Sequence, residues 1–403
     1  MAYTKYSLTP ANNTATPPDG APEGMLPSAV NDTMRDMMAQ IRDCGDGIRD
    51  GTYTMTAAKI TGGTITGITD LAIADGGTGA STAAGARTNL GLDGFVNMKN
   101  RIINGAMMID QRNAGASVTP VNAEYTLDRW QFSTLAAGKA TIQRSTVTPS
   151  GFVNSLLATS TSAYTIGASE FVSFRQFIEG LNISDLAWGT ANAKTVTLSF
   201  WVRSSLTGTF GGALSNSAAD RSYPFSYTIS AANTWEQKSI TIAGDTSGTW
   251  LTTNGIGIAV RFSLGAGSTY SATAGVWAAG TFVSATGATS VVGTNGATFY
   301  ITGVQLEVGS TATSFDYRPY TTELQLCQRY YELTDYEIVA SGVYAAGYWK
   351  VEKRASPTIT IKQRSTGSGG ALKAGSYSPT SAFTIQTYAS AAAAVQLEGA
   401  IEL

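Results

Sequence analysis

Aromatic side chains near turns are the residues of this sequence best suited to recognising a ligand. The segment SGVYAAGYWK (341–350) places Tyr344, Tyr348 and Trp349 close together, and Trp277 lies in another Gly- and Ala-rich run. An aromatic face packs against the C–H groups of a sugar ring, while amide and carboxylate groups bind its hydroxyls. These aromatic residues are therefore candidates for glycan contact, and packing inside the protein is the alternative.

The other tryptophans divide by their surroundings. Trp188, Trp235 and Trp250 border Gly-, Ser- and Thr-rich turns, so they are candidates of the same kind. Trp130 and Trp201 lie inside segments with strand character, where an aromatic residue is commonly buried. We expect these last two residues in the core of a domain.

Histidine is absent from the sequence, which excludes the nucleophilic systems and the zinc sites that depend on an imidazole. The Ser–His–Asp and Cys–His systems both need an imidazole base. Cys44 and Cys327 are far apart in the sequence, so they predict neither a disulfide framework nor a thiolate metal site. Glycine patterns that bind phosphate are missing as well. We therefore expect no catalytic residue, no metal and no cofactor.

An enzyme of this composition would have to rely on carboxylates, Lys, Tyr or Ser, and carboxylates are the groups that glycan cleavage would use. Glycoside cleavage needs two of them about 5 to 10 Å apart. The central region carries several candidates: Asp110, Glu124, Asp128, Glu170, Glu179 and Asp185. The sequence does not show whether any two converge, and Asp128 beside Arg129 and Asp110 near Arg112 are more simply interpreted as ion pairs. Because no long solenoid repeat is present either, we expect binding rather than cleavage.

The overall composition limits the kinds of partner. Only 13% of the 403 residues are charged, about half the usual share, which is typical of an all-β protein with a Thr- and Ser-rich surface. The net charge is -2 and no basic cluster is present, so we expect no nucleic-acid partner. No apolar run is long enough to span a membrane, and the N-terminus lacks the apolar core of a signal peptide. We expect synthesis in a cytoplasm and no membrane insertion.

Residues 1–50 form the first of the predicted segments. Proline and glycine are too frequent before residue 27 for a regular element, so an extended arm is expected there, either free or ordered against a partner. Residues 27–43 form the clearest helix, with Pro27 in its first turn and Gly45 and Gly47 at its end. Since no domain lies beside it, we expect a parallel bundle of identical helices. Its apolar stripe consists of Val30, Met34, Met37, Met38 and Ile41.

Residues 51–96 form a segment rich in glycine and threonine. Its apolar residues come one at a time: Ile60, Ile65, Ile68, Leu71 and Ile73. One thin apolar line cannot bury enough surface to offset the entropy of ordering the chain. Isoleucine and threonine nevertheless favour extended structure. Several identical chains wound together would let each line face the others, so we predict an intertwined fibrous shaft.

Residues 97–320 carry many short runs with strand character, separated by Gly-, Ser- and Asn-rich turns. The run 194–205 alternates with the two-residue period of a strand, and its apolar positions are Val196, Leu198, Phe200 and Val202. Repetition of such runs predicts a jelly-roll β-sandwich. The fold class is therefore mainly β.

Residues 321–403 form the last predicted segment. Residues 321–332 have helical character, and Cys327 within them is most simply a small buried hydrophobe. The sequence then returns to short strand-like runs. We predict a small C-terminal β tip domain.

Four blocks of the sequence resemble parts of tailed-bacteriophage tail fibres and receptor-binding fibre proteins. PEGMLPSAVNDTMRDMMAQIRD (22–43) resembles their virion-anchoring segment, and IADGGTGASTAAGARTNLGL (73–92) is similar to the linker after their shaft. NRIINGAMMIDQR (100–112), with EYTLDRW (124–130), resembles the opening of a jelly-roll, carbohydrate-binding-like domain. YITGVQLEVGSTATSFDYRPYTTELQLCQRYYE (300–332) resembles the end of that domain.

The resemblance implies a homotrimeric fibre on the tail of a virion, synthesised in the host cytoplasm. Residues 1–50 would attach to phage tail proteins such as an adaptor, nozzle or baseplate. The sandwich and tip would bind host surface glycan or lipopolysaccharide, which makes the tip aromatics the preferred contacts. Two alternatives stay open. One is a structural adaptor or head or tail fibre that carries another receptor-binding protein, and the other is a glycan-degrading tailspike.

Overall fold

The computed structural model describes residues 26–50, 98–338, 344–363, 372–374, 380–387 and 393–403, with isolated residues between 78 and 90. The chain divides into two compact units, Met1–Gly77 and Thr78–Leu403. The predicted arm before residue 26 lies outside the described residues, and so does the predicted shaft line of Ile60, Ile65, Ile68, Leu71 and Ile73. Among the described residues, no helix is both long and apolar enough to cross a membrane.

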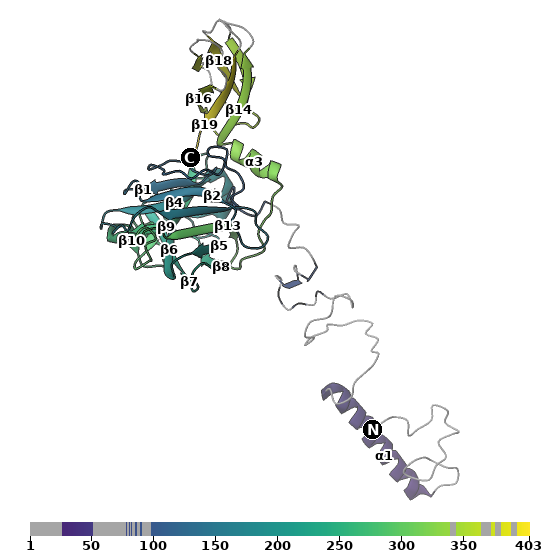
Figure 1. Ribbon diagram of the computed structural model, residues 1–403. Helices are drawn as coiled ribbons and strands as arrows, with labels where there is room; N and C mark the ends of the chain where they lie inside the picture. The colour runs from purple at the N-terminus through teal and green to yellow at the C-terminus, as the bar shows by residue number, and fades with distance from the viewer. Residues whose placement is uncertain are drawn as a thin grey trace. The chain divides into compact units, whose positions relative to one another are not determined.

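Helix α1 spans Pro27–Asp50 in the first unit (Figure 1). It begins at Pro27 as predicted, because the fixed φ of proline suits the first turn and its missing N–H would have no partner there. It does not end at Gly45 and Gly47, which corrects the sequence-based boundary. A single glycine costs only about 1 kcal/mol relative to alanine inside a helix, and no proline follows before Asp50.

The predicted apolar stripe lies on α1, and its side chains are exposed. Its exposed fractions are 40% for Val30, 56% for Met34, 42% for Met37, 66% for Met38 and 61% for Ile41. A stripe with the three- and four-residue spacing of one helix face normally packs against another element. The stripe is therefore available for contact with a further helix.

The second unit contains a β-sandwich (Figure 1). The strands of its first sheet pair antiparallel. In spatial order its strands are β1 (Gln131–Thr134), β4 (Phe171–Glu179), β9 (Ile256–Ala266), β6 (Gly208–Ser215), β7 (Arg221–Ile229) and β11 (Ala278–Ala279). Apart from β6 and β7, neighbouring strands of this sheet are far apart in the sequence. Arg175 of β4 pairs with Arg261 of β9, for example, so the sheet brings together side chains that no local pattern connects.

The second sheet of the sandwich is also antiparallel. Its strands are β2 (Ala140–Ser145), β3 (Ser155–Ser160), β13 (Thr298–Val308), β5 (Val196–Ser204) and β8 (Glu236–Ile242). The pairing of β13 with β5 shifts register between Thr302 and Gln305. Short elements accompany the sheets: η5 (Gly180–Asn182), η6 (Ser184–Leu186), η7 (Ser268–Tyr270), β10 (Ser271–Ala272) and β12 (Ser284–Ala285).

Aromatic rings from both sheets meet in the core of the sandwich. Phe174 of β4 lies 6.1 Å from Phe299 of β13, and Phe262 of β9 lies 5.1 Å from Phe200 of β5, between ring centroids. These rings are at most 1% exposed, as expected for two inner sheet faces. Trp130 is fully buried beside Phe174, as predicted. The prediction of a mainly β, jelly-roll sandwich is confirmed.

Trp201 was expected in the same core but lies half-buried instead. Strand β5 points Phe200 and Val202 into the core, so the residue between them faces outward. The alternation that predicted the strand therefore also predicts this outward position. The apolar character of tryptophan was the misleading signal.

The tip follows the sandwich through helix α3 (Tyr320–Gln328). The predicted helix over 321–332 ends early, because Tyr331 already starts a strand that pairs with the C-terminal strand along its whole length. Cys327 is fully buried in α3, as predicted. One tip sheet contains β14 (Tyr331–Ile338), β19 (Ala393–Ala400) and β16 (Thr358–Gln363), and the other contains β15 (Tyr344–Tyr348), β18 (Ala382–Thr387) and β17 (Leu372–Ala374).

Candidate functional site

The tip aromatics do not gather on one surface. Tyr348, on β15, is 79% exposed. Trp349 is only 5% exposed, and its ring packs 4.7 Å from the ring of Phe383. This burial leaves little of the indole to contact a sugar. The side chain of Tyr344 lies outside the described part of the structure.

Trp277 belongs to a cluster of three indoles. Its ring centroid lies 5.4 Å from that of Trp188 and 5.3 Å from that of Trp250, both edge-on. Each indole N–H donates to a backbone carbonyl oxygen. Trp188 and Trp250 are buried and Trp277 is half-buried, so the cluster packs loops together rather than presenting open faces. Trp235 stands apart and packs on Tyr300.

The two ion pairs predicted from sequence neighbours are wrong. The Asp110 carboxylate accepts the backbone N–H groups of Asn113 (2.9 Å) and Gly115 (2.6 Å). Asp128 is fully buried and accepts the side-chain amide of Gln111 at 2.6 Å, while the nearest cation, Arg112, lies 4.0 Å away. Burial raises the pKa of Asp128 and outweighs these partners. Tertiary neighbours, and not adjacent residues, decided the pairing.

Arg129 instead ties the C-terminus to the sandwich. Its guanidinium is 1% exposed, pairs with the Glu402 carboxylate and lies 3.6 Å from the ring centroid of Tyr330. Its second terminal nitrogen donates to the Phe177 carbonyl oxygen at 2.6 Å. Glu402 also accepts from Arg112 at 2.9 Å. Removing any one of these three charged side chains would leave a buried charge uncompensated, which is strongly destabilising.

Glu179 forms a second connection between the sandwich and the tip. Its carboxylate, at the end of β4, accepts the two guanidinium nitrogens of Arg329 at 2.8 and 3.1 Å and the hydroxyl of Tyr330 at 2.6 Å. Burial raises the pKa of Glu179, but these donors outweigh it and hold the pKa below its ordinary value. The carboxylate is therefore ionised over the usual pH range.

A hollow of about 510 Å³ lies at this junction. This volume falls within the range of about 300 to 1,000 Å³ that ligand sites occupy. The guanidinium of Arg112 lies 3.5 Å from the ring centroid of Tyr331 and 5.3 Å from that of Tyr125. The lining combines rings, amide, carboxylates and a hydroxyl: Arg112, Asn113, Glu124, Tyr125, Tyr331, Thr358, Glu398, Ala400, Ile401 and Glu402.

The accessible groups of this junction hollow suit a hydroxyl-rich ligand. Tyr125 is half-buried and held by a 2.9 Å hydrogen bond from its hydroxyl to the Leu403 carbonyl oxygen. Glu124 and Thr358 are exposed, and the amide of Asn113 is half-buried. A ring face with a carboxylate, an amide and a hydroxyl around it is the chemistry of sugar recognition. Sequence reasoning did not select these residues as a set, because the fold assembles them from separate segments.

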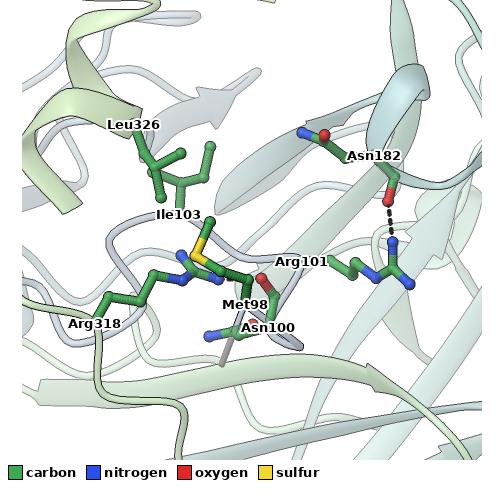
Figure 2. A pocket seen from close by; sticks show the side chains of 7 residues that line it. All are labelled: Met98, Asn100, Arg101, Ile103, Asn182, Arg318 and Leu326. Carbon is green, nitrogen blue, oxygen red and sulfur yellow. Dashed lines mark hydrogen bonds between the residues drawn. The ribbon is translucent and has the colours of Figure 1, made fainter. Parts of the chain in front are cut away.

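A smaller pocket, of about 110 Å³, lies near the start of the sandwich (Figure 2). Its arginines already have partners: Arg101 donates to the Asn182 carbonyl oxygen at 2.6 Å, and Arg318 donates to that of Asn100. The volume is well below that of a typical ligand site. This pocket is therefore part of the framework. Among the described residues, no group of His, Cys, Asp and Glu side chains could hold a metal ion.

No protein family and no curated protein sequence matches the chain. Solved structures with a similar fold include the enzymatically active domain of tailspike protein 4 from bacteriophage CBA120, with 13% identity, a TM-score of 0.29, and coverage of 52% of this chain and 22% of that one. A CBM4 structure has 14% identity, a TM-score of 0.27 and coverage of 51% and 98%. A family 11 carbohydrate-binding module from Clostridium thermocellum has 12% identity, a TM-score of 0.25 and coverage of 50% and 99%. No conclusion about ligand or activity follows from scores this low.

Proposed function

We propose that the chain is a virion fibre protein that attaches a tailed phage to its host by binding surface glycan. The sequence blocks that resemble phage fibre proteins support the virion setting. The sandwich and the tip supply the binding surface. The mechanism is non-covalent recognition, with no catalytic step.

The observation that carries this proposal is the junction hollow. It combines the half-buried ring of Tyr125 with the exposed carboxylate of Glu124 and the exposed hydroxyl of Thr358, in a volume of about 510 Å³. Such a site can stack on one face of a sugar while polar groups bind its hydroxyls. Individual contacts of this kind are weak. Several linked copies of the site would raise the avidity about 10²- to 10⁴-fold.

The exposed stripe of α1 supports assembly and anchoring. Met34, Met38 and Ile41 are each more than half exposed on one face of the helix. Burying such residues in a bundle stabilises each by about 1.5 to 3 kcal/mol relative to exposure. Three copies of α1 in parallel would cover the stripe and leave the preceding arm to contact the virion.

The test is binding of the full-length chain to an array of bacterial surface glycans. Tyr125→Leu removes the ring, and Glu124→Gln removes one charge without changing the side-chain volume. We expect each variant to lose about tenfold in affinity for the glycan that the native chain selects. Glu352→Gln changes an exposed carboxylate outside the hollow and serves as the control. Equal binding by all four proteins would place the glycan elsewhere, and no binding by the native chain would argue against the proposal.

A glycan-cleaving activity is the second candidate, because Glu124, Glu398 and Glu402 all line the hollow. Glu402 pairs with Arg112 and Arg129, so the candidate acid–base residue is Glu124, whose carboxylate accepts the backbone N–H of Val121 at 2.8 Å. Incubation of the selected glycan with the chain distinguishes the two functions. Release of oligosaccharide by the native chain but not by Glu124→Gln would establish cleavage, whereas intact glycan supports binding alone.

A further inference from the structure

Two arginines lie side by side on the outer face of the first sheet. Arg175 of β4 is the direct cross-strand partner of Arg261 of β9. Phe174 and Phe262, next to them in sequence, point into the core, so the arginines point the other way. Arg261 is nevertheless only 5% exposed. The sheet therefore holds two like charges together at a largely buried position.

Neither arginine has a carboxylate partner within the described part of the chain. The Nε–H of Arg175 donates to the Gln131 side-chain oxygen at 2.7 Å, and its guanidinium lies 4.4 Å from the ring centroid of Phe177. Arg261 has no hydrogen-bond acceptor among the described residues, and its Nε is buried. Burial, together with the neighbouring Arg175, lowers the pKa of Arg261 to about 9.

The neighbours on this face offer no compensation. Ser173 and Ser263 form the next outward cross-strand pair on one side, and Ala259 lies on the other. A buried cation without a partner destabilises a fold by several kcal/mol, and like charges directly across a sheet repel. Other buried arginines of this chain, such as Arg129, have ionic partners. Arg261 is 5% exposed against 1% for Arg129, and no described residue supplies it with an anion.

The arginine pair continues a row of side chains that begins at the hollow. Tyr125 pairs across the sheet edge with Gln131, Gln131 with Arg175, and Arg175 with Arg261. Tyr125 also lines the hollow. Arg175 is half-buried, so a ligand reaches the pair from its side. A saccharide that contacts Tyr125 therefore has the arginine pair further along the same row, beyond Gln131.

We propose that Arg175 and Arg261 bind the anionic group, carboxylate or phosphate, of an acidic saccharide. The two guanidinium groups present planar sets of N–H donors that match the oxygens of either group. The saccharide part of this inference rests on the proposed function, whereas the anion part rests on the arginine pair alone. The ligand supplies the negative charge that the described residues do not.

The experiment is calorimetric titration of the full-length chain with matched sugars. The probes are galacturonate against galactose for the carboxylate, and glucose 6-phosphate against glucose for the phosphate. We expect one acidic sugar to bind about tenfold or more tightly than its neutral counterpart. Equal binding within both pairs would overturn the proposal and leave neutral glycan binding intact. If inorganic phosphate binds and none of the four sugars does, the result would support the arginine site and count against the proposed glycan function.

Substitution of Arg261 separates a binding role from a structural one. Arg261→Met should abolish the preference for the acidic sugar and raise the melting temperature, because it removes an uncompensated buried charge. Arg261→Lys keeps the charge but loses the planar donors, so it should retain part of the preference. The control is Arg203→Met on the second sheet, where Arg203 stacks on Tyr300 and donates to the Asn233 carbonyl oxygen.

Two results with Arg261→Met would overturn the assignment. A lower melting temperature with unchanged preference for the acidic sugar would make Arg261 a structural residue. A change in oligomer mass with unchanged sugar affinity would assign the pair to a contact between copies of the chain.

Discussion

The buried ion pair of the tip allows a quantitative test of the packing. The Nζ of Lys353 lies 2.5 Å from the Glu332 carboxylate and 2.5 Å from the Gln328 carbonyl oxygen. The other carboxylate oxygen of Glu332 accepts the backbone N–H of Lys350 at 3.1 Å. Both charged side chains are fully buried. The perturbation we consider is Lys353→Met.

The magnitude follows from what the substitution leaves behind. Burial lowers the pKa of Lys353 although Glu332 favours its charged form, so desolvation outweighs the contact. Removing Lys353 leaves a buried carboxylate without a cation, and we expect a loss of about 3 to 5 kcal/mol in the free energy of unfolding. The double variant Glu332→Leu with Lys353→Met leaves no charge behind. Its stability should return to within about 1 kcal/mol of the native chain or exceed it.

The assay is urea unfolding of the full-length chain at neutral pH, followed by circular dichroism. Lys350→Met is the control, because Lys350 is exposed and engages Glu332 only through its backbone; its effect should stay within about 0.5 kcal/mol. If the double variant is as unstable as Lys353→Met alone, the unpaired charge is not the cause of the loss, and the reasoning fails.

Further predictions concern Glu179, Cys327 and the α1 stripe. Because the folded pKa of Glu179 is held below its ordinary value of 4.5, its stabilisation is present above pH 4.5 and is lost as the pH falls through the folded pKa. Glu179→Gln should remove that part of the acid dependence of the urea midpoint, and an unchanged acid profile would contradict it. Burial raises the pKa of the Cys327 thiol well above its ordinary value. In a Cys44→Ser background the thiol should therefore react with a disulfide reagent only after denaturation, and rapid labelling of the native chain would refute this. Met34→Glu should weaken self-association about tenfold or more in analytical ultracentrifugation, whereas Arg35→Glu should not; equal effects would show that the stripe is not the contact.

Elements with a strong local pattern could be predicted from the sequence. The two-residue alternation of β5 identified the strand and its core face, since Val196, Leu198, Phe200 and Val202 are all fully buried. Helix α1 was identified from its stripe, and Pro27 from its place in the first turn. The predictions of where the helices end were less accurate. Pairing of β14 with β19 overrides helical propensity at Tyr331. This residue pairs with Ala400, which lies near the other end of the tip sequence.

The candidate sites could not be predicted, because they depend on strand register. Arg175 and Arg261 carry no local signal, and only the pairing of β4 with β9 makes them neighbours. The junction hollow likewise joins Tyr125, near the start of the sandwich, to Thr358 in the tip. Trp349 was a candidate sugar contact because of its aromatic side chain, but packing against Phe383 buries it.

By itself, the sequence determined the mainly β class, the helix with its apolar stripe and the absence of histidine chemistry, since these depend on residue type and on spacing of a few residues. Only the tertiary structure decided which charges pair. Asp128 lies next to Arg129 in sequence, yet Arg129 pairs with Glu402 from the far end of the chain. The register of β4 against β9 placed Arg175 beside Arg261, with no anion from the described residues. Long-range pairing sets these neighbours, because a β-sheet aligns segments irrespective of their separation along the chain.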